Sequence, residues 1–271
     1  MRNPLLSCLV VVLLGGCASR GVGLGAHDAS GGELAINLEA CSQVGDQPRH
    51  KPSKQQRLAE LHMALGAGYL QEGVLKVALT ELEESLALNP RSAQAHATMA
   101  LLQLRLNKPQ IAERHYRKAL ALDPSDPEIH NNYGVYLCGQ DRWQAADAHF
   151  RCAIANPLYR TPAMAYSNAA ECSMRGGDTG RAEIDLRTAA QIDPSFPTPS
   201  LMLARLNLDQ GNAAAARTHL TRYMRHAGQT PAGLALGIKI ETSLGDLDRA
   251  ASYRMLLKNR FPDSREAQEL H

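Results

Sequence analysis

The chain has 271 residues, with 29 Lys and Arg against 27 Asp and Glu, which gives a formal net charge of +2. This near-balance, together with an aromatic content of only 4%, argues against the basic, aromatic-rich surface of a nucleic-acid-binding protein. Hydrophobic residues make up 44%, and many of them are Ala and Leu, while Val and Ile are sparse after residue 80. The composition therefore predicts an all-α protein.

Residues 1–16 are typical of a signal peptide. Arg2 is followed by an apolar run of ten residues, Leu5 to Leu14, which is about half the length that a membrane-spanning helix needs. The run ends in Leu14-Gly15-Gly16-Cys17, which resembles the lipobox of bacterial lipoproteins. We therefore expect Cys17 to be acylated and to anchor the chain stably in a membrane. By the same resemblance, Ala18 after the cysteine implies sorting to the outer membrane, with the protein on its periplasmic face.

Residues 17–55 predict a lipidated, flexible tether. Five glycines lie between residues 21 and 32, and a polar stretch containing Pro48 and Pro52 follows. Hydrophobic periodicity is weak throughout, as in a linker. A flexible chain of this length spans roughly 30 Å root-mean-square, so it would hold a folded domain away from the membrane.

A 34-residue repeat organises residues 56–268. Asn89-Pro90 and Asp123-Pro124 are one period apart. This period divides the segment into six frames, near 59–92, 93–126, 127–160, 163–196, 197–230 and 231–264. Position 20 is alanine in every frame, which lets two helices approach closely: Ala78, Ala112, Ala146, Ala182, Ala216 and Ala250. Position 15 is Gly, Asn or Asp, residues that tolerate a positive φ at a helix end. The pattern resembles the tetratricopeptide repeat (TPR), an antiparallel helix pair that stacks into a superhelix.

Local signals mark where these helices begin and where the frame is interrupted. Ser92 is a predicted N-cap, and Asp126 precedes Pro127 at a first helical position. The third frame is followed by an insertion, Leu158-Tyr159-Arg160. The consensus Trp at position 4 is absent, and the sixth frame is the least regular, as expected of a terminal cap.

The third frame carries a more specific resemblance. Asn131-Asn132-Tyr133-Gly134-Val135-Tyr136-Leu137-Cys138 is similar to a signature of the PilF/PilW family of type IV pilus biogenesis lipoproteins. Further matches lie at 157–159, 168–172, 182–187, 236–241 and 261–264, so the resemblance covers about residues 52–268. It implies a pilotin-like role at the outer membrane, in which a TPR scaffold binds the pilus secretin and promotes its localisation and multimerisation.

Two other functions are compatible with parts of the sequence. A TPR lipoprotein could serve another envelope assembly machine, such as barrel assembly or peptidoglycan enzymes, and the NNYG-type segment argues against this alternative. A hydrolase is the other, but Ser167, Glu171 and Ser173 form no triad with a nearby His, and no phosphate-binding loop is present. We therefore expect no enzymatic activity, no cofactor and no small-molecule substrate.

Four cysteines remain after Cys8 leaves with the signal peptide and Cys17 is acylated. The family resemblance implies a disulfide between Cys138 and Cys172, which fall on neighbouring first helices; two buried thiols are the alternative. Cys152 is expected to be inert core, although it could compete for Cys138. Cys41 is left over in the tether. No CxxC pair is present, and histidines recurring one repeat apart are too distant to share a metal, so we expect no metal site.

The concave face of a TPR superhelix is lined by positions 2, 5, 9 and 12 of each first helix, and these are most apolar in the first two frames. An apolar groove commonly marks a partner site. The expected groove residues are Met63, Ala67, Leu70, Ala97, Leu101 and Leu104. Two alternatives remain open: residues 41–58 could fold back over the groove, or closure of the superhelix could bury it.

Overall fold

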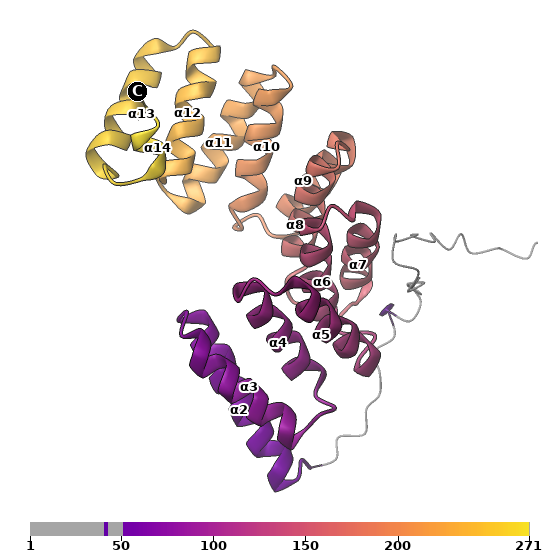
Figure 1. Ribbon diagram of the computed structural model, residues 1–271. Coiled ribbons are helices and arrows are strands. Elements are labelled where there is room, and N and C mark those ends of the chain that lie inside the picture. Colours follow the sequence, from indigo (N-terminus) through magenta and orange to yellow (C-terminus); the bar gives the residue numbers. More distant parts are fainter. Residues whose placement is uncertain (1–40, 43–50, 271) are drawn as a thin grey trace, which may run out of the picture.

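The computed structural model describes residues 41–42 and 51–270, and throughout this part of the chain the regular elements are helices (Figure 1). The paired helices are α2 (Lys54–Gln71), α3 (Leu75–Leu88), α4 (Ala93–Arg105), α5 (Pro109–Leu122), α6 (Pro127–Gly139), α7 (Trp143–Ala155), α8 (Pro162–Arg175), α9 (Thr179–Ile192), α10 (Thr198–Asp209), α11 (Ala213–Ala227), α12 (Pro231–Ser243) and α13 (Leu247–Arg260). A short α14 (Arg265–Gln268) follows.

Successive pairs stack along the chain from the indigo end to the yellow end in Figure 1, forming the expected all-α TPR superhelix. The expected signal peptide, Cys17 and most of the tether lie outside the described residues. The expected boundary at residue 56 falls inside α2, which begins at Lys54 after a Ser53 N-cap. No helix among residues 41–42 and 51–270 is both long enough and apolar enough to cross a membrane.

The turn inside each helix pair has the same backbone conformation at position 15. Asn107 and Asp141 have φ of 57° and 59°, and the glycines at this position have φ between 76° and 87°: Gly73, Gly177, Gly211 and Gly245. The left-handed region is costly for most side chains but not for Gly, and Asn and Asp adopt it more readily than other residues. The residue choice at position 15 is therefore explained by this turn, as the sequence predicts.

Close helix approach depends on small residues at two positions. The six alanines at position 20 are all buried in the structure. At position 8 of the third repeat, a Cβ added to Gly134 would lie 2.7 Å from Cε1 of Phe150. Any side chain there would push α6 away from α7, so glycine is required by packing rather than by backbone conformation.

The predicted helix starts are confirmed by side-chain caps. The hydroxyl of Ser92 accepts a hydrogen bond from the backbone N–H of Ala95 at 3.2 Å, and the Asp126 carboxylate accepts one from Ile129 at 2.9 Å. One residue of the insertion after the third repeat belongs to the core, because Tyr159 is buried with Ala153 and Ala165. At the C-terminal end, residues around α14 pack onto α12 and α13 and close the solenoid.

Candidate partner-binding site

The groove residues expected from the sequence divide into two groups. Leu70 and Ala97 are only 8% and 4% exposed, so they are core residues and offer a partner almost no area, contrary to the expectation. Leu70 packs with Leu82 and Leu102 because it lies at the end of α2 where α3 and α4 converge. The other four, Met63, Ala67, Leu101 and Leu104, are partly buried.

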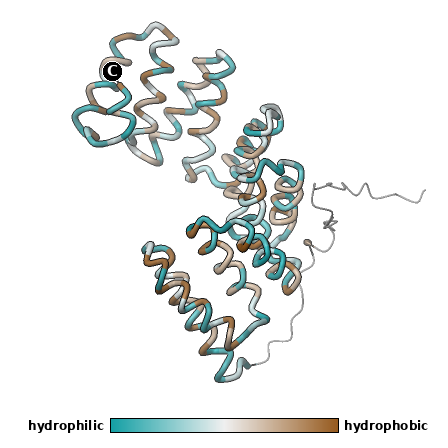
Figure 2. The backbone as a smooth tube through the Cα atoms, viewed as in Figure 1, coloured by the Kyte–Doolittle hydropathy of each residue, from teal (hydrophilic) through white to brown (hydrophobic). Residues whose placement is uncertain are grey.

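A second apolar surface lies on α2, and the sequence analysis did not single it out. Leu58, Leu61 and Leu65 are 43%, 55% and 42% exposed, and their spacing places them on one side of the helix. We call these three residues the N-terminal stacking face. Figure 2 shows hydrophobic segments interspersed with hydrophilic ones along α2 and α3, at the end of the solenoid.

Comparison with the later repeats explains why these leucines are apolar. Leu61 and Leu65 stand at positions 3 and 7, and in repeats two to six both positions are buried: Ala95, Met99, Ile129, Tyr133, Ala165, Ala169, Pro199, Leu203, Gly233 and Gly237. In a TPR stack these positions face the preceding repeat. In the described part of the chain no repeat precedes α2, so a stacking face with the character of a core remains open to a partner.

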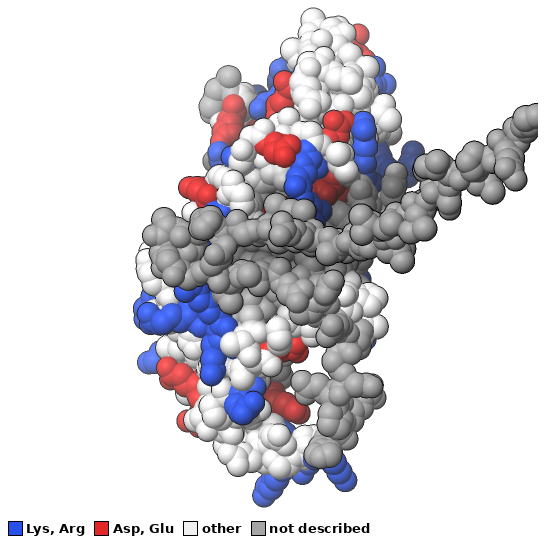
Figure 3. Space-filling view, turned by 90° about the vertical axis from the view of Figure 1, so that its right-hand side faces the viewer, with Lys and Arg blue, Asp and Glu red and all other residues white. Residues whose placement is uncertain are grey.

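The side of the molecule opposite α2, on the right in Figure 1 and facing the viewer in Figure 3, carries charges of both signs. On the face shown in Figure 3, Lys and Arg of the described residues lie beside Asp and Glu. Elsewhere in the fold, charged side chains are paired with each other, as in Arg151 with Asp185, and Arg217 with Glu241. The described residues on the face in view therefore do not present charge of a single sign.

The histidines form pairs within a repeat, which the sequence analysis missed. Nδ1 of His96 lies 3.0 Å from Nδ1 of His115, and Nδ1 of His130 lies 2.8 Å from Nδ1 of His149. In both pairs Nε2 of the first histidine points at a proline carbonyl in the preceding turn. The distance is 3.2 Å from His96 to Pro90 and 2.9 Å from His130 to Pro124. Nε2 must therefore donate to that carbonyl, and Nδ1 accepts from the partner ring.

This arrangement requires His96 and His130 to be neutral, and burial lowers the pKa of His115 and His149 as well. Burial lowers the pKa of His130, and burial together with the nearby His130 and Arg142 lowers the pKa of His149 well below 6.5. The common separation of 19 residues, positions 4 and 23 of a repeat, was visible in the sequence. This separation identifies the histidine pairs once the first and second helices of a repeat are known to face each other.

A cluster around Glu113 is the most polar part of the middle repeats. Its carboxylate accepts hydrogen bonds from Arg117, Arg142, Tyr133 and Tyr136 at 2.7 to 3.2 Å. Burial alone would raise the pKa of Glu113, but the two arginines hold it below its usual value, while burial raises the pKa of Tyr136 to about 12. General acid–base catalysis needs a pKa near the working pH, so this cluster has the character of a structural ion pair.

Two disulfides join the middle of the fold. Cys138 of α6 is bonded to Cys172 of α8, with Cα atoms 5.6 Å apart, which is the pairing that the family resemblance implies. Cys41 is bonded to Cys152 of α7, with Cα atoms 5.2 Å apart. The expectation that Cys152 is inert core and that Cys41 is left over in the tether is therefore wrong, because Cys41 lies against α7 of repeat three.

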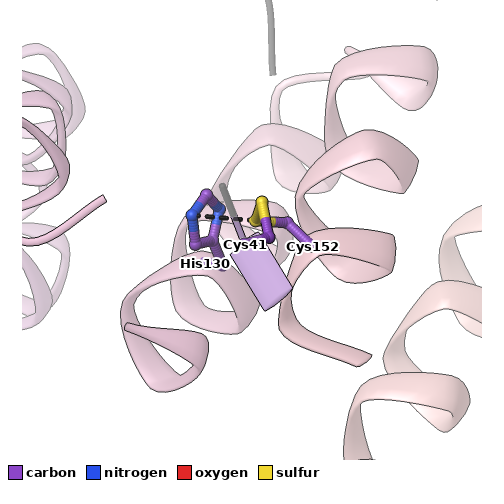
Figure 4. A group of neighbouring side chains, drawn as sticks. All are labelled: Cys41, His130 and Cys152. Carbon is purple, nitrogen blue, oxygen red and sulfur yellow. Dashed lines mark hydrogen bonds between the residues drawn. A yellow bond between two sulfur atoms is a disulfide. The ribbon is translucent and has the colours of Figure 1, made fainter. Parts of the chain in front are cut away.

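Figure 4 shows that His130 lies next to this second disulfide, with Nε2 at 3.1 Å from Sγ of Cys152. Cys41, His130 and Cys152 are close enough together to be considered as metal ligands. Metal binding requires free thiolates and an available imidazole nitrogen. Here the two sulfurs are bonded to each other, and His130 Nε2 faces the Pro124 carbonyl at 2.9 Å, so the arrangement suits a structural crosslink.

Repeated helix pairs, a shared left-handed turn and an open stacking face define a TPR scaffold, and residues 98–159 match the tetratricopeptide repeat family. The chain is 31% identical over 237 residues to the type IV pilus assembly protein PilF of Pseudomonas aeruginosa, covering 87% of this chain and 94% of that protein. The chain belongs to the PilF/PilW family of type IV pilus assembly factors.

Solved structures agree with this assignment. The structure of Pseudomonas aeruginosa PilF superimposes with a TM-score of 0.71 at 30% identity, over 80% of this chain and 98% of that one. PilW, described as a widely conserved type IV pilus biogenesis factor, superimposes with a TM-score of 0.72 at 31% identity, over 78% and 96%. The family and the fold expected from the sequence are thus confirmed.

Proposed function

We propose that this protein is an outer-membrane lipoprotein of type IV pilus biogenesis, anchored through Cys17 on the periplasmic face, whose TPR domain binds the pilus secretin and promotes its localisation and multimerisation. Membership of the PilF/PilW family supports the pilus role, since PilF is a type IV pilus assembly protein and PilW a type IV pilus biogenesis factor. The lipobox supports the anchor. The secretin as partner rests on the family resemblance.

The observation that carries a binding role is the N-terminal stacking face. Positions that are buried in the five later repeats are exposed leucines in the first, so a partner helix laid against α2 would complete the packing that a preceding repeat would supply. Burial of one such side chain contributes roughly 1.5–3 kcal/mol, which corresponds to at least a tenfold change in affinity. The partly buried Met63, Ala67, Leu101 and Leu104 are the candidates for extending this contact along the first two repeats.

The test is a pair of charged substitutions on the N-terminal stacking face, Leu61→Glu and Leu65→Glu. Because both side chains are exposed, the variants should keep wild-type helicity and thermal stability yet lose secretin multimers on gels and pili on the cell surface. Ile184→Glu is the control, since Ile184 is also an exposed apolar residue, on α9, and its substitution should be silent. Multimers at wild-type levels in folded Leu61→Glu and Leu65→Glu proteins would place the partner elsewhere.

Leu70→Glu is unsuitable for this test. It would bury a charge between Leu82 and Leu102 and unfold the first repeat, so loss of function would carry no information about binding. The anchor is tested separately, because labelled palmitate should enter the wild-type protein and not Cys17→Ser. Equal labelling of both would contradict acylation at Cys17.

A further inference from the structure

We propose that the Cys41–Cys152 disulfide is a staple that fixes the end of the tether on repeat three, so that the membrane anchor holds the domain by its middle and not by its first repeat. The staple itself follows from the described residues. Its consequence for the membrane rests on the proposed acylation of Cys17.

The contact has the burial expected of a built crosslink. Cys41 is 2% exposed and Cys152 is 1% exposed, and the bond joins residues 111 positions apart. On the other side the imidazole of His130 lies against the Cys152 sulfur, as Figure 4 shows. Reductants attack a disulfide through a thiolate that must reach the sulfur. Since both sulfurs are shielded, the bond is a lasting part of the fold and not a readily exchanged one.

The staple moves the point at which the tether meets the domain. Along the chain the first repeat begins at Ser53, 36 residues after Cys17, and without the staple the anchor would pull on the start of α2. With the staple the free tether ends at Cys41, 24 residues after Cys17, beside α7 (Figure 1). The random-coil span falls only from about 33 Å to about 27 Å, so the main effect is on orientation.

Holding the domain at repeat three separates anchoring from recognition. The N-terminal stacking face lies on α2, at the end of the solenoid, while the staple lies on α7. Without the staple, the anchor would pull at Ser53, one turn before Leu58 and next to the surface proposed for a partner helix. With the staple, the pull of the anchor is applied at Cys152 on α7.

Formation of the staple is ordinary disulfide chemistry in an oxidising compartment. The Cys41 and Cys152 thiols lose two protons and two electrons as the S–S bond forms. A protein disulfide of the oxidative folding machinery accepts both and is reduced to a dithiol. The exchange takes place before the domain closes over the two sulfurs, because afterwards neither is exposed.

Limited proteolysis of the mature, full-length chain tests the staple. Brief trypsin treatment should cut after Arg20 and Arg49 and produce a peptide of residues 21–49 that contains Cys41. Without reductant this peptide should stay attached to the domain in the intact mass, and with reductant it should be released. Cys41→Ser should release it under both conditions, whereas the double variant Cys138→Ser, Cys172→Ser should behave like wild type. Release from the wild type without reductant, or attachment to Cys138, would overturn the proposal.

Energy transfer to a membrane dye tests the orientation. A fluorophore is placed at Gln144 on α7 or at Glu83 on α3, both exposed, in acylated protein on vesicles. The ratio of transfer at Gln144 to transfer at Glu83 should fall at least twofold in Cys41→Ser. An unchanged ratio would show that the staple does not orient the domain. Failure of both proteins to float with vesicles would instead contradict the lipid anchor, leaving the proteolysis result to decide the staple.

Discussion

Repeat one and repeat three share the same helix pair, but the same positions meet different surroundings. Positions 3 and 7 are Ile129 and Tyr133 in repeat three, both buried against the repeat before, whereas in repeat one they are the exposed Leu61 and Leu65. The residue types are alike, and only the neighbour differs. In a solenoid, the same position is buried between repeats in the middle and exposed at an end where no repeat covers it.

The two repeats also differ in what holds them. Repeat three contributes to both disulfides, to the His130–His149 pair and to the stacked rings of Tyr116, Tyr133 and Tyr136. Repeat one has neither a disulfide nor a neighbour on its outer side among the described residues. The covalent and aromatic contacts are therefore concentrated in the middle of the chain, and the proposed binding surface lies at its start.

The largest difference should come from truncating position 7 in the two repeats. Tyr133→Ala removes a buried ring from the core and should cost about 3–5 kcal/mol of unfolding free energy. Leu65→Ala, at the equivalent exposed position, should change stability by less than about 0.5 kcal/mol. Chemical denaturation of both variants measures the difference. Similar losses in the two would mean that the stacking face is already covered within the protein.

Removing the Cys138–Cys172 bond should be nearly as costly. The bond closes a loop of 34 residues, for which the chain-entropy estimate is about 3–4 kcal/mol. The double variant Cys138→Ser, Cys172→Ser should melt at a lower temperature than the oxidised wild type. It should still respond to reductant through the Cys41–Cys152 bond. If its melting point equals that of the wild type, the middle repeats do not depend on this crosslink.

Two glycine substitutions compare packing in the same pair of repeats. Gly134→Ala pushes a methyl group into the Phe150 ring and should destabilise by about 1–3 kcal/mol. A Cβ at Gly68 on α2 meets nothing within 4 Å, so Gly68→Ala should stabilise the helix by about 0.5–1 kcal/mol. Melting temperatures shifted in opposite directions are expected. A loss of stability at Gly68→Ala would indicate a contact on α2 that the structure does not show.

Acid should destabilise the middle of the chain, and this is the smallest of the four expected effects on stability. In the folded protein the pKa of His149 is well below 6.5 because the ring is buried and lies near His130 and Arg142. Burial also lowers the pKa of His130, and the nearby Asp123 offsets part of this effect. Below pH 6.5 the unfolded chain binds protons that the folded chain does not, so stability falls as pH falls, by at most about 1.4 kcal/mol per pH unit for each histidine. His149→Asn should reduce the slope of melting temperature against pH between 6.5 and 5.5. An unchanged slope would assign the acid sensitivity to other groups.

The fold could be predicted because each repeat imposes the same local demands. A left-handed turn at Asn107 or Gly73 and a close helix contact at Ala112 restrict the residue type, so the pattern appears in one sequence without knowledge of tertiary structure. The helix starts at Ser92 and Asp126 are equally local, since the capping oxygen and the N–H it serves are three residues apart.

The candidate site was predicted less well because exposure depends on neighbours. Leu70 and Ala97 stand at positions that line the concave face in a general repeat, yet here adjacent helices cover both. The exposed Leu61 and Leu65 stand at positions normally covered. The Cys41–Cys152 bond joins residues 111 apart and depends on where a segment outside the repeat docks, for which the 34-residue pattern contains no signal.

The Cys41–Cys152 bond also determines which parts of the molecule bear mechanical tension. If a lipid at Cys17 is pulled against a partner seated on α2, the force enters at α7 and leaves at the first repeat. Two routes can share it: the folded stack of repeats one to three, and the covalent link from Ser42 to Ser53. Repeats four to six lie beyond the point of attachment and carry no load, so they can bend or open without weakening the connection between membrane and partner.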